Sequence, residues 1–589
     1  MSTSAPARSH VRVAGTRFGG AAVRLALPAL VVGAGAGVAA VVFRWLIMHA
    51  TRVFSGHADY SATTGHPANP WVPWLGAGFV VVAPVVGGLL YGPLIHRFAR
   101  EARGHGVPEV MFALDRNGGR IRGSVAVVKA LASAICIGAG GSVGREGPII
   151  QIGSALGSTI GRWARMPEVR VKTLVACGAA GGISATFNAP VAGIFFALEL
   201  LLRDFTPTSF GAVAIASVTA ALVGRAVFGD SAFLHLPAIA GVTPPEYLLF
   251  ALLGLVAGAV GIGFTRVLYL VEDACDLLWK ATRGPEWLRP AVGGVLLGLL
   301  LLALPQMYGV GYPVLEHGVA GQYALAFLAV LVVGKVLATS LTLGIGGSGG
   351  VFAPSLFIGA MVGAAFGEVA ATVDPALHGQ VGAFAVVGMG AVFAGSTRAP
   401  ITAGIMLFEL TGDYALVLPV VVAVVIATAV SKVLSRDTVY TLKLSRRGVD
   451  LTDSALAVRR PSGRTAGGAA RPLGPVVSRA ASAADALAAL ESGGGAPVVV
   501  LDADGRFAGV VSARSAGDAV LTDVEFAARP VTDVLSDVVP VRSDAGLDTV
   551  VQDVVDASDT AGLPVVDEDG RPVGWLGQAD ALRALVPAR

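Results

Sequence analysis

The sequence predicts an all-α polytopic membrane protein with broken helices and an internal repeat, followed by a C-terminal α/β region. Three observations lead to this fold class. Hydrophobic residues make up 54% of the 589 residues and charged residues only 14%, whereas about 25% charged residues is usual in soluble proteins. Gly- and Pro-rich motifs occur twice, and the composition becomes that of a soluble protein after about Lys443. A soluble, disordered or collagen-like chain is therefore excluded.

Residues 1–21 are expected to form a basic tail on the cytoplasmic side. The tail and the start of the first apolar run contain no acidic residue and four arginines, Arg8, Arg12, Arg17 and Arg24. Such an excess of positive charge keeps a segment in the cytoplasm. The run is long and lacks a small-residue cleavage site, which favours a retained helix over a signal peptide. With a net charge of only +3, spread over loops and ends, nucleic-acid binding is not expected.

Residues 22–443 are expected to form the membrane domain, in two halves of about 22–225 and 247–443. Because a helix needs about 20 apolar residues to cross the hydrocarbon core, most of the long apolar runs are candidate spans. These runs cover residues 25–43, 75–98, 247–271, 290–304, 323–342 and 414–434.

The two halves share motifs at matching places. GGSVGREGPIIQIGSALG, beginning at Gly140, aligns without gaps with GGSGGVFAPSLFIGAMVG, beginning at Gly346, 206 positions later (346 minus 140). A second pair aligns NAPVAGIFFALEL from Asn188 with RAPITAGIMLFEL from Arg398. Repeated helices interrupted by Gly and Pro are typical of transporters whose site lies near the membrane midplane, between the halves.

Three Gly-rich elements each precede a predicted helix: GHGVPEVM (104–111), GSVGREGP (141–148) and VFAP (351–354). The free amides and the dipole at a helix N-terminus attract an anion without a full positive charge. Three such ends aimed at one point would hold a dehydrated anion weakly enough to let it pass. The alternative is that the glycines only allow close helix packing.

Glu146 lies inside the second of these elements, in an apolar region where an ionisable residue indicates function. An ionised carboxylate there would compete with the anion, and a protonated one would move aside. Glu146 is thus a candidate for both gate and proton carrier. The structural alternative is a permanent pair with Arg145, although adjacent helical residues diverge.

GREGP (144–148), GGVFAP (349–354) and GHGVP (104–108) resemble the CLC family of chloride channels and transporters, over roughly residues 22–443. The resemblance implies an inverted-topology repeat and a homodimer with one anion pathway per subunit. It also implies chloride bound by main-chain amides near Val351 and Phe352 and by the Tyr440 hydroxyl. Lys129 lies at a family position as well. The full set of anion-binding candidates is His105, Gly106, Arg145, Gly147, Val351, Phe352 and Tyr440.

Two positions depart from the family pattern. His105 replaces the usual serine, and its ring is either an anion donor that titrates near neutral pH or a histidine turned toward intracellular water. Leu200 stands where the exchangers have an inner proton-transfer glutamate. Its neighbour Glu199 is a possible relay, but its repeat partner Glu409 favours a shared structural role such as capping a helix end.

The tail after the linker 444–472 repeats a helix followed by two strands around a turn, in 473–528 and 529–589. It resembles a pair of CBS domains, which in some proteins bind adenine nucleotides. The phosphate and ribose motif is half present in each copy, as Ser512 in the first and Asp580 in the second. A structural or assembly role is therefore favoured over nucleotide sensing.

The sequence favours passive, Glu146-gated chloride permeation across the cytoplasmic membrane, because Leu200 cannot carry a proton. A chloride/proton antiporter is the alternative. A membrane-tethered sensor leaves the Glu146 motif unexplained. An intramembrane serine protease at Ser348, in GGSGG, is remote because no histidine lies centrally in an apolar helix. No enzymatic activity and no metal are expected; the expected partners are chloride, protons, the lipid bilayer and a second copy of the chain.

Overall fold

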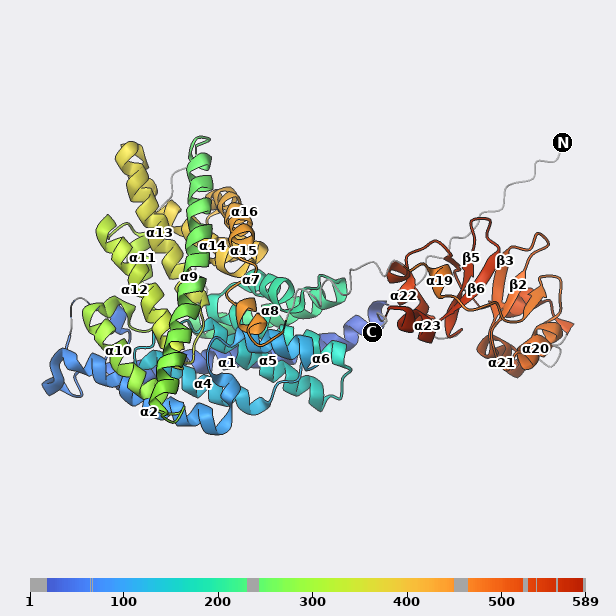
Figure 1. The fold of residues 1–589 in the computed structure, drawn as a ribbon, viewed down its shortest axis with the longest axis horizontal. Coiled ribbons are helices and arrows are strands. Elements are labelled where there is room, and N and C mark those ends of the chain that lie inside the picture. The colour runs from blue at the N-terminus through green and yellow to red at the C-terminus, as the bar shows by residue number, and fades with distance from the viewer. Residues whose placement is uncertain are drawn as a thin grey trace. The chain divides into compact units, whose positions relative to one another are not determined.

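A computed structural model describes residues 18–63, 65, 67–229, 243–449, 464–522, 528–536, 538–557 and 560–585 (Figure 1). The chain divides into two compact units, Met1–Leu451 and Thr452–Arg589. The division falls within the predicted linker 444–472.

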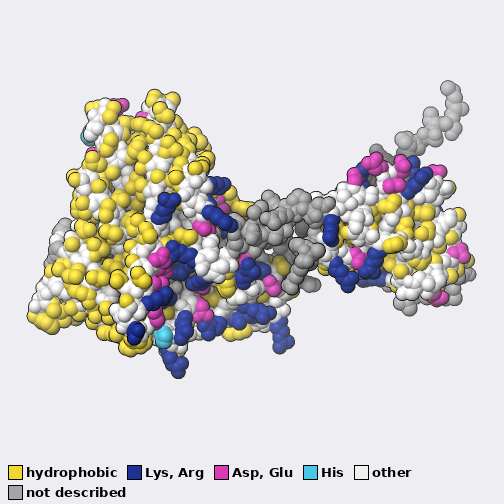
Figure 2. Space-filling view, viewed as in Figure 1, with side chains coloured by type: hydrophobic (Ala, Val, Ile, Leu, Met, Phe, Trp, Pro, Cys, Tyr) yellow, Lys and Arg dark blue, Asp and Glu magenta, His cyan; other side chains and the backbone are white. Residues whose placement is uncertain are grey.

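In the described residues of the first unit, all regular elements are helices, joined by turns and loops. Eight of its helices are long and apolar enough to cross a membrane, and Figure 2 shows hydrophobic side chains over most of its visible face. The chain is therefore a multi-pass membrane protein, as predicted. Its helices are α1 (Phe18–Ser55), α2 (Phe79–Phe98), α3 (Val107–Arg116), α4 (Gly123–Gly138), α5 (Glu146–Trp163), α6 (Glu168–Phe187), α7 (Pro190–Phe196), α8 (Pro207–Phe228), α9 (Glu246–Thr282), α10 (Arg289–Ala303), α11 (Tyr312–Val319), α12 (Leu325–Gly344), α13 (Phe352–Val373), α14 (Val381–Thr397), α15 (Pro400–Thr411), α16 (Val417–Leu434) and α17 (Thr441–Ser445).

The two halves of this unit are built alike. Gly140 and Gly346 have φ of +104° and +100°, a conformation that only glycine adopts readily. From these turns the chain enters α5 at Glu146 and α13 at Phe352, which are again 206 positions apart (352 minus 146). The predicted repeat is thus present in the backbone, and it brings α5 and α13 to corresponding places.

Helix α5 packs closely on α6, and α13 packs in the same way on α14. A Cβ added to Gly153 would overlap the carbonyl oxygen of Gly178, and one added to Gly359 would overlap that of Gly388. Both crossings bring backbone against backbone, so glycine is required for the distance between the helices. They set the positions of α5 and α13, and hence of the helix starts at which the candidate site lies.

Gly153→Ala is therefore expected to destabilise the protein. The added methyl group meets a backbone carbonyl that cannot rotate away, and overpacking of this kind costs about 1–3 kcal/mol. The effect is measured as the unfolding temperature in detergent, with the loss of the folded peak in size-exclusion chromatography as the readout. Gly263→Ala in α9 is the control, because a methyl group there meets no atom within 4 Å. Equal unfolding temperatures for the two variants would contradict the packing argument.

The second unit contains two similar three-stranded sheets, of order β1-β2-β3 and β4-β5-β6. In each, the first strand runs parallel to the second, and the third is antiparallel to the second. This confirms the tandem α/β repeat. Its elements are α19 (Ala466–Ala469), β1 (Val476–Ser478), α20 (Ala483–Ser492), β2 (Val498–Leu501), β3 (Phe507–Val511), α21 (Ala513–Thr522), β4 (Val541–Arg542), α22 (Leu547–Asp556), β5 (Gly562–Val566), β6 (Pro572–Gly577) and α23 (Gln578–Leu585).

Candidate functional site

Glu146 is the first residue of α5, and its side chain is fully buried. The Tyr312 hydroxyl donates a hydrogen bond to Oε1 at 2.7 Å. The backbone N–H of Ala353, in the first turn of α13, donates to Oε2 at 3.3 Å. The carboxylate of one half thus lies at the helix N-terminus of the other half, which is a favourable position for a negative charge. Each of its oxygens thus accepts a hydrogen bond from a residue other than Arg145.

The three predicted Gly-rich elements meet at this point. Gly144 and Gly350 exchange two backbone hydrogen bonds, of 2.8 and 2.6 Å. The amide of Gly104 donates to the carbonyl of Gly347 at 3.1 Å. A Cβ on Gly106 would come within 2.7 Å of the Gly147 carbonyl oxygen. Backbone groups from residues far apart in the sequence are therefore held together, as the prediction of converging helix starts required.

Two buried lysines hold these loops, and both are fully inaccessible. The Lys129 ammonium donates to the carbonyls of Ala102 and Gly104, at 2.9 and 2.7 Å. The Lys335 ammonium donates to the Val310 carbonyl at 2.8 Å, with Gly309 O and Ser142 Oγ also in range. Lys335 was not predicted from the sequence, although it lies 206 positions after Lys129 (335 minus 129), the offset of the repeat. Since Val310 lies two residues before Tyr312, the first residue of α11, Lys335 also fixes the segment that carries Tyr312.

His105 and Tyr440 are both buried, at 1% exposure each. Among the described residues, the two ring nitrogens of His105 have no hydrogen-bond partner. The same is true of the Tyr440 hydroxyl. The His105 ring lies 6.1 Å from that of Tyr269, whose hydroxyl binds the carbonyl of Val439, next to Tyr440. Buried polar groups normally have partners. A dehydrated anion would accept hydrogen bonds from both side chains.

Val351 and Phe352 form the start of α13, where the first amides have no carbonyl within the helix to bind. The Phe352 ring packs on Phe393, Phe187 and Phe196, with centroids 4.5, 5.6 and 6.3 Å away. This aromatic cluster makes the surroundings of the helix start apolar, which strengthens the attraction of its amides for an anion. The Arg145 guanidinium lies 5.0 Å from the centroid of the Tyr312 ring.

Glu199 and Glu409 cap helices across the two halves. Glu199 accepts from the amides of Ile401 and Thr402 at the start of α15, at 3.1 and 2.8 Å. Glu409 accepts from those of Val191 and Ala192 at the start of α7, at 2.9 and 2.6 Å. The shared capping role predicted from the repeat is confirmed. A relay by Glu199 remains a prediction; Leu200 follows it in a π-helical turn, Ala197–Leu202, and is buried.

Ser348, the nucleophile of the remote protease alternative, forms no hydrogen bond with a histidine among the residues that the structure describes. Its hydroxyl donates to the Ala102 carbonyl at 2.7 Å and lies 2.9 Å from the Ser133 hydroxyl. Activation of a serine requires a base within hydrogen-bond reach. These contacts give Ser348 a role in joining the Gly-rich loops.

In the second unit, both candidate nucleotide-binding groups contact protein. The Ser512 hydroxyl lies 3.1 Å from that of Ser536, and Asp580 Oδ1 accepts from the Arg471 guanidinium at 2.6 Å. A nucleotide would have to displace these partners.

Comparisons with known proteins agree with this geometry. A family model described as voltage gated chloride channel matches residues 87–432, and one described as CBS domain matches residues 531–587. The H(+)/Cl(−) exchange transporter ClcA of Vibrio parahaemolyticus is 36% identical over 356 residues, which are 60% of this chain and 76% of that protein.

Two solved structures share the fold. The crystal structure of a slow cyanobacterial Cl−/H+ antiporter has a TM-score of 0.63 and 27% identity, covering 72% of this chain and 98% of its own. A eukaryotic CLC transporter, with 22% identity and a TM-score of 0.58, covers 95% of this chain and 98% of its own. The second likeness is one of fold alone.

Proposed function

Because the chain belongs to the voltage gated chloride channel (CLC) family and ends in a CBS domain, we propose that it exchanges chloride for protons across the membrane. The observation that carries the proposal is the position of Glu146. Its carboxylate lies at the N-terminus of α13, where the amides would otherwise hold an anion. The N-terminus of α13 can thus bind either the Glu146 carboxylate or a chloride ion, but not both at once.

The expectation of passive permeation is wrong. The ClcA relative and the cyanobacterial structure are both named as exchangers of chloride and protons. That expectation assumed that a proton leaves Glu146 only through a second carboxylate, which Leu200 cannot supply. A file of water molecules can carry a proton past an apolar side chain, so the missing acid does not make chloride movement passive.

Exchange follows from the charge of Glu146. When ionised, the carboxylate is attracted to the α13 amides and excludes chloride from them. When protonated, it loses most of that attraction, moves away and admits chloride. Chloride can therefore occupy the helix start only after the carboxyl group has taken up a proton. His105 and Tyr440 supply the hydrogen-bond donors for the anion further along its path.

The assembly and orientation belong to the same proposal. The chain is a homodimer in the cytoplasmic membrane, with one pathway in each subunit. Its N-terminus and its CBS tail face the cytoplasm, as the basic N-terminal residues favour. Cross-linking in intact cells tests the dimer, and protease digestion of inverted membrane vesicles tests the side of the tail.

Proton movement driven by chloride tests the function. Proteoliposomes are loaded with high chloride and diluted into low chloride at the same pH. Chloride efflux is expected to drive proton uptake, which an internal pH dye reports as acidification of the lumen. Addition of a protonophore should collapse the signal. Chloride efflux without proton uptake would contradict the exchange.

The CBS tail is proposed to be structural, with weak or absent nucleotide binding. The Arg471 guanidinium donates a hydrogen bond to Asp580, and the Ser536 hydroxyl lies within hydrogen-bond distance of the Ser512 hydroxyl. Titration calorimetry of the full-length protein with ATP is expected to show no saturable binding below about 1 mM, since ATP must break a charge-assisted hydrogen bond at Asp580. Tight binding that Asp580→Ala abolishes would contradict this prediction.

A further inference from the structure

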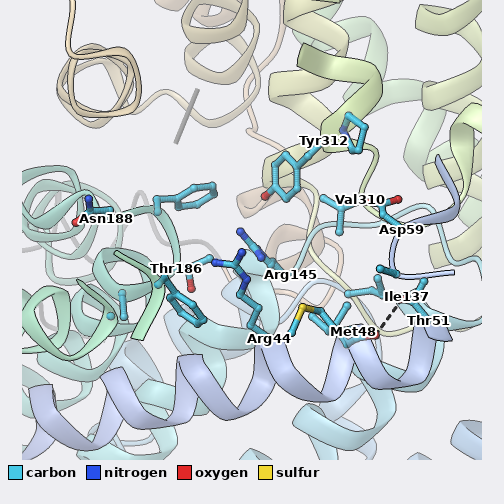
Figure 3. A pocket seen from close by; sticks show the side chains of 18 of the residues that line it. Arg44, Met48, Thr51, Asp59, Ile137, Arg145, Thr186, Asn188, Val310 and Tyr312 are labelled. Atoms are coloured by element: carbon cyan, nitrogen blue, oxygen red, sulfur yellow. Dashed lines mark hydrogen bonds between the residues drawn. The ribbon is translucent and has the colours of Figure 1, made fainter. Parts of the chain in front are cut away.

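The cavity beside Tyr312 gives water access to the outer side of the gate. It measures about 490 Å³, and Tyr312, whose hydroxyl donates to Glu146, forms part of its wall (Figure 3). Met48 and Thr51 also line it and lie near the C-terminal end of α1, away from the basic tail that is proposed to be cytoplasmic. A proton that leaves Glu146 for the cytoplasm must instead cross the buried interior on the other side.

His105 lies on this inner side, against the residue that follows Glu146. A Cβ built on Gly147 would come within 2.1 Å of the His105 carbonyl oxygen, so the two backbones are in contact. The His105 ring also interacts electrostatically with Lys443 and Arg447. These two residues lie where the chain passes into the linker to the CBS tail, which is proposed to be cytoplasmic. His105 is thus placed between the gate and the cytoplasm.

The His105 ring is free to accept and give up a proton. The residue is 1% exposed, and its ring nitrogens have no hydrogen-bond partner among the described residues. Glu199, the other candidate relay, differs in this respect. Its carboxylate accepts three hydrogen bonds, from the amides of Ile401 and Thr402 and from the Thr402 hydroxyl. Those bonds hold the carboxylate at the start of α15, so it is not free to pass a proton on.

Three cations act on the His105 ring and oppose its protonation. They are Lys129 of α4, Lys443 of α17 and Arg447, which follows α17. Each makes a further positive charge on the imidazole less favourable. Tyr269 packs on the ring with the centroids 6.1 Å apart, and a tyrosine carries no charge near neutral pH. An anion held by a ring N–H group would balance the added charge.

The acids that face these cations are engaged by them. A carboxylate oxygen of Glu272, on α9, lies 3.0 Å from the Lys443 ammonium. In the same way, Glu109 of α3 lies 2.8 Å from the Arg447 guanidinium. The negative charge that a protonated imidazole needs is therefore best supplied by the transported anion, bound at the ring itself.

We propose that His105 is the proton relay between Glu146 and the cytoplasm, and that it holds its extra proton only while an anion is bound at its ring. The inference rests on the proposed function and names the group that Leu200 does not supply. The ring accepts a proton from cytoplasmic water at its free nitrogen and becomes an imidazolium. It then gives up one N–H proton, through water, to the Glu146 carboxylate and returns to the neutral form. The reverse sequence carries a proton to the cytoplasm.

His105→Gln tests the relay in proteoliposomes. Glutamine keeps an N–H donor for the anion but cannot take up a proton. The variant is expected to lower the number of protons moved per chloride ion by about tenfold or more, since a positioned proton carrier is lost. Chloride flux should still rise at low pH, because Glu146 is intact. His105→Ser, which is neutral and smaller, should behave in the same way if glutamine does not fit.

His96→Gln is the matched control, because it changes an exposed histidine at the end of α2. It should keep the proton-to-chloride ratio of the unmodified protein. The same unmodified ratio in a folded His105→Gln or His105→Ser variant would overturn the relay.

A binding measurement separates this inference from the proposed function. Chloride is added to the Glu146→Gln variant in weakly buffered detergent solution, between about pH 5 and 7, where histidine titrates. A pH electrode should record proton uptake as the anion binds, and the uptake should vanish when His105→Gln is combined with Glu146→Gln. This result supports the link between proton and anion even if the unmodified protein does not exchange them. No uptake in Glu146→Gln, or uptake that survives in the double variant, would overturn the proposal.

Discussion

Glu146→Gln is expected to abolish proton transport completely while chloride flux remains. Glutamine has nearly the shape of a protonated glutamate, but it neither ionises nor carries a proton. The neutral amide is not drawn to the amides of α13 as a carboxylate is, so chloride enters without waiting for protonation. Chloride efflux and proton uptake, measured on the same proteoliposomes between pH 4.5 and 8, should show a pH-independent chloride flux and no proton signal.

Glu316→Gln is the matched control for this variant. Glu316 is an exposed acid of α11, the helix that also carries Tyr312. Its substitution should leave both the proton signal and the pH dependence of chloride flux as in the unmodified protein. A folded Glu146→Gln variant that still pumps protons, or that moves no chloride, would contradict the role assigned to Glu146.

Tyr312→Phe is expected to increase chloride flux about tenfold at neutral pH. The variant removes the hydroxyl that donates to Glu146 Oε1 at 2.7 Å but keeps the ring on which Arg145 lies. A hydrogen bond to a charged group contributes about 1.5–3 kcal/mol, and about 1.4 kcal/mol is one factor of ten. Loss of this bond weakens the state in which the carboxylate blocks the pathway.

The same variant should loosen the exchange, so that more chloride ions move for each proton. Tyr323→Phe serves as control, because the Tyr323 hydroxyl lies 3.4 Å from a ring nitrogen of His317 and not at Glu146. Flux and stoichiometry are measured together with paired chloride and pH electrodes. A Tyr312→Phe variant that behaves as Tyr323→Phe does would show that the hydroxyl does not hold the gate.

Much of the site could be predicted because the same motifs occur in both halves of the membrane domain. The motif at Gly140 occurs again at Gly346, and helix starts that align in sequence also meet in space through Gly144 and Gly350. The capping role of Glu199 followed from the same symmetry, since each half supplies one carboxylate to a helix of the other. The helix starts and their caps depend on residues that are close together in the sequence, so they can be predicted from it.

Tyr312 could not be found in this way. It lies in no repeated motif, and it acts through the contact of α11 with the start of α5, which is distant in sequence. Lys335 was within reach, because the offset from Lys129 equals that of the motifs. The error about passive flow arose at Leu200, because one missing acid was taken to exclude every path for a proton.

The reversal potential in a pH gradient tests the exchange most directly. Proteoliposomes of the unmodified protein are prepared with equal chloride on both sides and a pH difference of two units, and the membrane potential at zero net chloride flux is set with potassium and valinomycin. Obligate exchange predicts a reversal potential displaced from zero, because the proton gradient drives chloride. A reversal potential of zero, the chloride equilibrium value, would contradict the account.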